Sequence, residues 1–252
     1  MPCTAVAHFH KSRRTRYAPD CTPKVAEPRR HRYRSVDRLE QEYGAMEFLP
    51  ALRTFLAETC VTLKIQPKRS DVFDVYKAAR IPLPSSYHLP DSTMNSTKVH
   101  AVPSRRTKNA RKSDSPARFD MVLVVEDRAG RKSDPSGIRG LRVAQVRVIF
   151  KLPGELGGTN EQEPLAYVHW FRPLQSIDPV GNMFKLVRST RQSRPNASII
   201  PVSAIVRTCH LAPRFGTAAV MESWATDDRN EFLLNKYIDH SMFEMLRHHA
   251  YE

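Results

Sequence analysis

The sequence predicts a mainly β, α+β protein with a few helices, built around one small β-rich domain that forms a barrel or a sandwich. Five short apolar runs follow one another between residues 121 and 211, with lengths typical of strands. The connections between them are rich in Gly, Pro and Asp, which suits antiparallel turns. In the run 141–150, apolar residues alternate with Gln145 and Arg147, the period-two pattern of a half-buried strand. The predicted strands are 121–125, 141–152, 165–171, 183–188 and 198–211.

Short helices and strands are expected in residues 36–84. Ser35 is a candidate N-cap, and acidic residues follow it near the positive end of the helix dipole. Gly44 interrupts this helix, and apolar residues at helical spacing predict a second helix after it. The remaining predicted elements are strands at 61–65 and 72–81, and a terminal helix at 240–249.

Residues 1–35 are expected to form a flexible, disordered basic arm. Interspersed prolines discourage a helix, and the clusters KSRRTR and RRHRYR place cations close together. Such clusters suit phosphate contacts or nuclear import signals, while a solvated tail without a partner is the alternative. The candidate nucleic-acid-binding residues of the arm are Arg13, Arg14, Arg16, Arg29, Arg30, Arg32 and Arg34.

Residues 85–118 are expected to form a second disordered basic segment, a linker. They are rich in Ser, Pro, Thr and Asn and have almost no apolar periodicity. Its length favours separate units at 36–84 and 119–215 with an extension at 216–252, although the strand at 72–81 could still pair with the later sheet. The candidate nucleic-acid-binding residues of the linker are Arg105, Arg106, Arg111 and Lys112.

The charge balance favours a polyanionic partner. Lys and Arg number 40 against 26 Asp and Glu, a net charge of +14. Neutralising phosphates releases condensed counterions, which dominates sequence-independent affinity for nucleic acid. The alternative is that the excess charge only keeps the chain soluble.

The cysteines and the hydropathy pattern exclude other classes. The four cysteines form no CxxC pair, which argues against a disulfide framework and a structural zinc site. No run approaches the length of a membrane span, and the N-terminus has no signal-peptide pattern. We therefore expect a reducing compartment, no membrane partner, no metal, no cofactor and no small-molecule substrate.

Long stretches of the chain resemble the C-terminal region of fungal DNA transposases of the Plavaka type, distant relatives of CACTA elements. The resemblance rests on LRVAQVRVIFKLP, LAYVHWFRPLQSIDPVGNMFKLVRS and ASIIPVSAIVRTCHLAPRFG, and extends upstream through RYRSVDRLEQEYGAMEFLPALRTFL and DVFDVYKAARIPLP. It implies a transposable-element-derived piece, a detached C-terminal fragment or a domesticated remnant, with the catalytic core N-terminal to these residues.

The order of elements in 141–212 also resembles a bromo-adjacent homology (BAH) domain. The strands VAQVRVIF and MFKLVRS, the Arg-Pro end WFRP and the turn IIPVSAI carry this resemblance. It implies a small, partly open β-barrel of BAH/SH3-like type that engages proteins or nucleosomes. The long loops at 153–163 and 189–196 depart from that pattern.

Three aromatic residues in the predicted strand 165–171 are candidates for partner binding. Tyr167, Trp170 and Phe171 could form a cage that holds methylated lysine, such as that of a histone tail, by cation–π attraction. Core packing is the stronger alternative, because an alternating strand turns at least one set of its residues inward.

No catalytic motif stands out. A DDE nuclease needs three carboxylates around two metal ions, and Asp120, Glu126 and Asp127 come closest to such a set. Walker, GxGxxG, HExxH and GxSxG motifs are missing. We therefore expect a nuclear, non-catalytic module that associates with DNA or chromatin without sequence preference. The alternatives are a protein-interaction module, for example toward a transposase core, a decayed remnant, and a DDE nuclease fragment.

Overall fold

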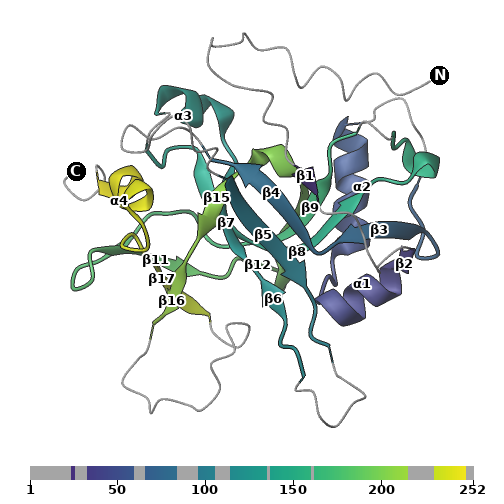
Figure 1. Cartoon of the computed structure of the whole chain (residues 1–252), viewed down its shortest axis with the longest axis horizontal. Coiled ribbons are helices and arrows are strands. Elements are labelled where there is room, and N and C mark those ends of the chain that lie inside the picture. The colour runs from purple at the N-terminus through teal and green to yellow at the C-terminus, as the bar shows by residue number, and fades with distance from the viewer. Residues whose placement is uncertain are drawn as a thin grey trace.

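The computed structural model describes residues 24–25, 33–59, 66–83, 96–105, 114–134, 137–159, 162–214 and 230–247. Within these ranges the fold is mainly β with few helices, as the sequence predicts (Figure 1). The helices are α1 (Val36–Tyr43), α2 (Phe48–Thr59), α3 (Arg128–Ser133) and α4 (His240–Arg247). Of the predicted helices, the two before residue 60 and the terminal one are confirmed.

The largest sheet is organised around one long strand, β8 (Leu141–Lys151). Residues 144–150 of this strand pair antiparallel with β9 (Leu165–Trp170) on one edge. On its other edge the first half pairs with β7 (Met121–Val125) and the last three residues pair with β3 (Val72–Tyr76). The outer strands are β14 (Ala197–Pro201) beside β9, β15 (Ile205–Cys209) beside β7, and β2 (Arg34–Ser35) beside β3.

A smaller sheet lies across the first one. Its strands are β1 (Lys24–Val25), β4 (Ala78–Pro82), β5 (Ser96–Val102) and β6 (Arg118–Phe119), in that order. β4 and β5 lie in front of β8 in Figure 1. Two bends link the sheets: the chain turns at Lys77 from β3 into β4, and at Asp120 from β6 into β7. The carbonyls at these bends accept the N–H groups of Ala101 and Val146, so the pairing continues across both.

The described sheets are open, and none closes on itself into a barrel. Small and β-branched residues fill the space between the two sheets, among them Ala79, Val99, Val124 and Val146. Their small size lets the two sheets approach closely, so the inner face of the β4–β5 pair packs directly on the large sheet.

Helices α1 and α2 cover the opposite side of the large sheet. Gly44 ends α1 in a left-handed conformation with φ 64°, which a glycine adopts without strain. Phe48 then anchors α2: its ring lies 5.2 Å from that of Phe73 and 5.1 Å from that of Phe150, both edge-on. Ser35 occupies the N-cap position, but its side chain makes no capping hydrogen bond.

These contacts correct the predicted division into domains. Because β3 pairs with β8 and α2 packs on β14, residues 36–84 belong to the same folded unit as 119–215. The expected linker contains β5 and the first residue of β6, and the expected arm contains β1 and β2, so neither is wholly disordered. The predicted strand 72–81 is two strands separated by the bend at Lys77, and the predicted strand 61–65 lies outside the described residues.

The half-buried character predicted for the strand around Gln145 and Arg147 is also wrong, because both faces of β8 are covered. Arg147 is buried, its Nε donates to the carbonyl of Tyr43 at 2.7 Å, and its guanidinium lies 3.9 Å from the ring centre of Phe119. Gln145 is buried and its Oε1 accepts a hydrogen bond from Arg188 at 3.0 Å. Satisfied partners are what allow these two polar side chains inside the fold.

A third sheet closes the C-terminal side. It contains β10 (Ile177–Asp178), β11 (Met183–Val187), β17 (Glu231–Leu234) and β16 (Leu211–Pro213), in that order. Between β11 and β14 in the sequence, β12 (Thr190–Arg191) and β13 (Arg194–Pro195) pair as a short hairpin. Helix α4 packs on this sheet through Met242, Met245 and Leu246. Within the described ranges, no helix is long and apolar enough to cross a bilayer.

Candidate nucleic-acid interface

The outer face of the β4–β5 pair brings exposed basic residues from two adjacent strands together. Strand alternation turns Ala79 and Ile81 of β4 and Val99 and Ala101 of β5 into the core. The same alternation turns Arg80 and Lys98 outward, and both are exposed. The small apolar residues therefore fix the sheet while the two long cationic side chains face solvent.

Arg80 and Lys98 are direct cross-strand partners. Opposed residues of an antiparallel pair have Cβ atoms about 4.5–5.5 Å apart, and like charges at such positions repel. Neither cation has an ion-pair or hydrogen-bond partner among the described residues. On the other edge of β4, the register aligns Lys24 of β1 with Arg80, so basic residues occupy matching positions on three adjacent strands.

Toward β6 the positive charge of this face is partly neutralised by Asp120. Arg118 of β6 stands opposite Val102 of β5, and its Nε lies 3.2 Å from Oδ1 of Asp120. The second carboxylate oxygen of Asp120 is 2.7 Å from Nδ1 of His100, and it also accepts the backbone N–H of His100 at 2.8 Å. Asp120 thus orders this end of the face and leaves the pair at Arg80 and Lys98 as its uncompensated part.

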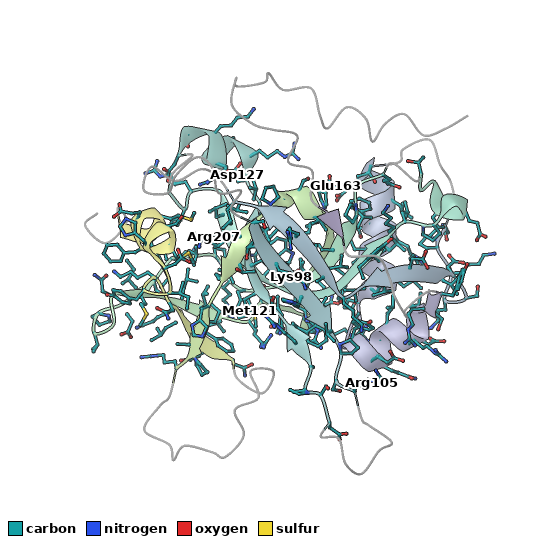
Figure 2. All side chains as sticks on the ribbon, viewed as in Figure 1. Lys98, Arg105, Met121, Asp127, Glu163 and Arg207 are labelled. Atoms are coloured by element: carbon teal, nitrogen blue, oxygen red, sulfur yellow. The ribbon has the colours of Figure 1, made fainter. Side chains whose placement is uncertain are left out.

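Figure 2 shows Lys98 in the middle of this face and Arg105 at its lower end. Arg105 is exposed and pairs through its backbone with Ser115, which holds the two sides of the hairpin together beyond β5 and β6. Of the basic residues predicted to bind nucleic acid, Arg105 is the one that the structure places in continuity with the β4–β5 face.

The prediction that Arg34 contacts phosphate is wrong, because its guanidinium is used within the fold. It lies in β2, its Nη1 pairs with Glu42 at 3.2 Å, and its side chain is only 15% exposed. This guanidinium holds β2 against α1, because the partner carboxylate sits near the end of that helix. The other predicted contacts lie outside the described residues: Arg13, Arg14, Arg16, Arg29, Arg30, Arg32, Arg106, Arg111 and Lys112.

The three aromatic residues predicted to form a cage are instead interior residues. Tyr167 and Phe171 are fully buried and Trp170 is 8% exposed. They also belong to three different core clusters. The Tyr167 hydroxyl accepts the N–H of Glu47 at 3.2 Å, and the Trp170 indole N–H donates to Ser198 at 2.7 Å. Their burial leaves no open aromatic pocket for methylated lysine, and the core-packing alternative explains them.

The three carboxylates closest to a DDE set are each engaged separately. Asp120 contacts His100, and Glu126 pairs with Arg142 at 2.5 Å. Asp127 caps α3, accepting the N–H groups of Ala129 and Gly130. In the part of the chain that the structure describes, no three His, Cys, Asp or Glu side chains come together as metal ligands.

Sequence reasoning missed Arg80 and Lys98, the pair at the centre of the face. Arg80 falls in a predicted strand, where its alternation with Ala79 and Ile81 could have marked it as outward-facing. Lys98 falls in the segment interpreted as a linker. Their opposition depends on the pairing of β4 with β5 across an intervening loop, and no local pattern encodes that register.

Comparison with protein-family models, with curated proteins and with solved structures finds no match to this chain.

Proposed function

We propose that this chain is a non-catalytic module that associates with DNA or chromatin, and that the outer face of β4 and β5 is its contact surface for the phosphate backbone. The observation that carries the proposal is the exposed pair Arg80 and Lys98, directly opposed across two strands without an acidic partner among the described residues. Like charges held this close repel each other, and a bound phosphate between them would relieve that repulsion.

The charge of the whole chain supports the same partner. A net charge of +14 attracts a polyanion at long range, and cations on a rigid sheet lose little freedom on binding. The basic residues of the segments 1–35 and 85–118 would add further phosphate contacts. Phosphate contacts carry no base readout, so the association is independent of sequence.

The resemblance to Plavaka transposases implies an origin and a cellular location for the module. We place the module in the nucleus, derived from a fungal transposable element related to Plavaka transposases, with its β-rich core corresponding to a partly open BAH-like barrel. The bends at Lys77 and Asp120 support the barrel comparison, because they carry the chain from one sheet to the other and join their edges.

The experiment is duplex-DNA binding followed by fluorescence anisotropy at low salt, with the full chain and two double variants. R80Q/K98Q removes the opposed pair. R38Q/K132Q removes one Arg and one Lys that are exposed on α1 and α3, and is the control of equal charge. We expect the first variant to weaken binding at least about tenfold, since charge-assisted hydrogen bonds contribute roughly 1.5–3 kcal/mol each. Equal affinities of the two variants would overturn the assignment of this face.

A protein-interaction function is the second candidate, and a different surface favours it. Tyr237 and Ile238, in the turn before α4, are 60% and 50% exposed. The ring of Phe243 lies 6.0 Å from that of Tyr237 and extends this apolar patch along α4. Aromatic residues are enriched at protein interfaces. If the protein does not bind duplex DNA at low salt, this surface becomes the leading contact site.

A further inference from the structure

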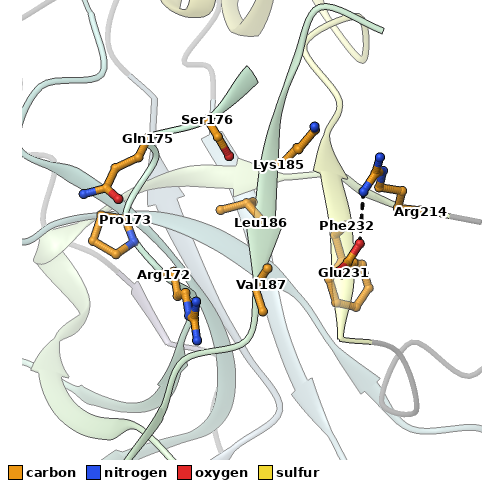
Figure 3. Close-up of a pocket in the computed structure, with 10 residues that line it drawn as sticks. All are labelled: Arg172, Pro173, Gln175, Ser176, Lys185, Leu186, Val187, Arg214, Glu231 and Phe232. Atoms are coloured by element: carbon orange, nitrogen blue, oxygen red, sulfur yellow. Dashed lines mark hydrogen bonds and ion pairs between the residues drawn. The ribbon is translucent and has the colours of Figure 1, made fainter. Parts of the chain in front are cut away.

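A second cationic site lies away from the β4–β5 face, on the outer side of the third sheet. It is a pocket of about 250 Å³ bounded by the segment 172–176, by β11 and by the start of β17. Figure 3 shows Arg172 and Gln175 on one side of β11, and Arg214 with Glu231 on the other. Its volume lies just below the usual range for small-molecule sites, about 300–1,000 Å³, so only a small ligand would fit.

One end of the pocket is arranged for an oxyanion. Nζ of Lys185 and Nη2 of Arg214 lie 3.7 and 3.8 Å from the same atom, Oδ1 of Asp178. Both distances exceed hydrogen-bond length, so these two cations converge on one point while keeping N–H donors for another oxygen. Nη1 of Arg214 donates to Glu231 at 3.2 Å, which fixes the direction of the guanidinium.

Asp178 does not saturate the two cations, because it has a structural partner of its own. Its Oδ2 accepts the N–H of Gly181 at 2.9 Å in the β10–β11 turn. This hydrogen bond is the main reason that the pKa of Asp178 is lowered. The carboxylate therefore stays ionised and orders the turn, while three cations line or border the pocket against the two carboxylates of Asp178 and Glu231.

The other end of the pocket suits a planar, partly apolar group. Arg172 is exposed, and its guanidinium has no partner among the described residues. Pro173 follows it in the pocket wall. The backbone N–H of Arg172 donates to the carbonyl of Val187, which holds this segment beside β11. A guanidinium stacks on nucleobases, and a proline or valine side chain packs against a sugar or base. Gln175 and Ser176 supply further hydrogen-bonding groups.

We propose that this pocket binds a nucleoside monophosphate, with Lys185 and Arg214 holding the phosphate and Arg172 facing the base. The site is separate from the β4–β5 face and does not rest on the DNA-binding function. A lone inorganic phosphate would leave the Arg172 end of the pocket empty. An uncharged nucleoside would bring no phosphate oxygen to Lys185 and Arg214, whose ion-pair partners would then remain the carboxylates of Asp178 and Glu231.

The test is titration of the full chain with adenosine 5′-monophosphate, adenosine and inorganic phosphate, followed by backbone amide chemical shifts. We expect the monophosphate to bind saturably at or below about 1 mM, with adenosine at least about tenfold weaker. The shifts are expected at the amides of 172, 174–176 and 185–187. Equal affinity of adenosine and its monophosphate, or shifts confined to other residues, would overturn the site.

Variants separate the roles of the two ends. K185Q is expected to weaken monophosphate and inorganic phosphate alike by about tenfold, whereas R172Q weakens only the monophosphate. R191Q, which removes an exposed arginine from the β12–β13 hairpin outside the pocket, is the matched control. R80Q/K98Q should bind the monophosphate normally, which keeps this result distinct from the test of the DNA face. A loss in R191Q equal to that in K185Q would show nonspecific charge attraction and contradict the proposal.

Discussion

Arg80 of β4 and Lys98 of β5 stand directly opposite each other on the solvent side of a sheet whose other side is packed on the core. The buried neighbours Ala79 and Val99 fix the register, so the two cations cannot move apart by slipping one strand against the other. Alternation along each strand therefore exposes both cations, and the register keeps them close enough to contact one phosphate.

Replacing Lys98 by Glu should stabilise the fold while weakening DNA binding. The substitution converts a repulsive cross-strand pair into an attractive one, worth about 0.2–1 kcal/mol in free energy of unfolding. Urea unfolding would measure the gain, and K132E on α3, which has no cross-strand partner, is the control. A loss of stability in K98E, with none in K132E, would show that Lys98 has a structural role.

Arg207 of β15 and Asp239 are expected to dock α4. Nη2 of Arg207 lies 2.5 Å from Oδ2 of Asp239, and Oδ1 of Asp239 caps the helix by accepting the N–H of Met242. R207M should lower the free energy of unfolding by about 1.5–3 kcal/mol, the range for hydrogen bonds to charged groups. Half exposure of Asp239 keeps the loss below that of a fully buried pair.

Hydrogen exchange of the α4 amides is the direct measurement of this docking. R207M should accelerate exchange in α4 more than in β8, because the pair attaches the helix and not the central sheet. S241A, which removes only the hydrogen bond from Arg207 Nη1 at 2.9 Å, should have a smaller effect. Unchanged exchange in α4 of R207M would mean that the apolar contacts of Met242, Met245 and Leu246 hold the helix without the ion pair.

Phe48 tests whether the helices and the large sheet form one cooperative unit. Its ring is fully buried and contacts the rings of Phe73 and Phe150. F48A should cost about 3–5 kcal/mol. It should lower the urea midpoint monitored through Trp170, which belongs to another core cluster, in a W224F background that removes the second tryptophan. If 36–59 were a separate domain, the fluorescence of Trp170 would follow the wild-type transition.

Alkaline pH should destabilise the protein through Tyr43. Burial raises the pKa of Tyr43 from 10.0 to about 12. Between these values the unfolded tyrosine releases its proton while the folded one retains it, so the stability present below pH 10 falls as the pH rises toward 12. The loss is at most about 1.4 kcal/mol per pH unit for this group.

Chemical unfolding from pH 9 to 12 would measure this slope, and Y43F should reduce it while keeping the ring in the core. A residual slope is expected, because burial raises the pKa of Tyr167 as well, and raises that of Cys209 to about 12. An identical slope in Y43F and wild type would contradict the assignment to Tyr43.

Local patterns in the sequence predict local structure in this chain. Apolar spacing around Phe48 and Leu52 marks α2, Gly44 marks the end of α1, and short apolar runs mark β7, β9 and β11. They do not predict that β8 is covered on both faces, because Gln145 and Arg147 look like solvent positions until Arg188 and Tyr43, far away in the chain, supply their partners.

The sequence predicts that the protein binds phosphate, but it does not predict which residues form the contact surface. The charge excess pointed to phosphate, and the cationic clusters of the arm drew attention to flexible segments. The rigid pair arises from pairing between β4 and β5, two strands separated by a loop, one of them inside a segment with little apolar periodicity. Conversely, Tyr167 and Phe171 look like binding residues in the sequence and are core residues because β9 lies between two covered faces.

The most direct test of the central claim is the salt dependence of duplex-DNA binding by wild type and R80Q/K98Q. Each phosphate contact contributes about −0.9 to the slope of log K against log salt concentration. Loss of the two cations should therefore flatten the slope by about 1.8, while R38Q/K132Q keeps the wild-type slope. Parallel lines for wild type and R80Q/K98Q would show that Arg80 and Lys98 do not contact phosphate, and the proposed interface would be wrong.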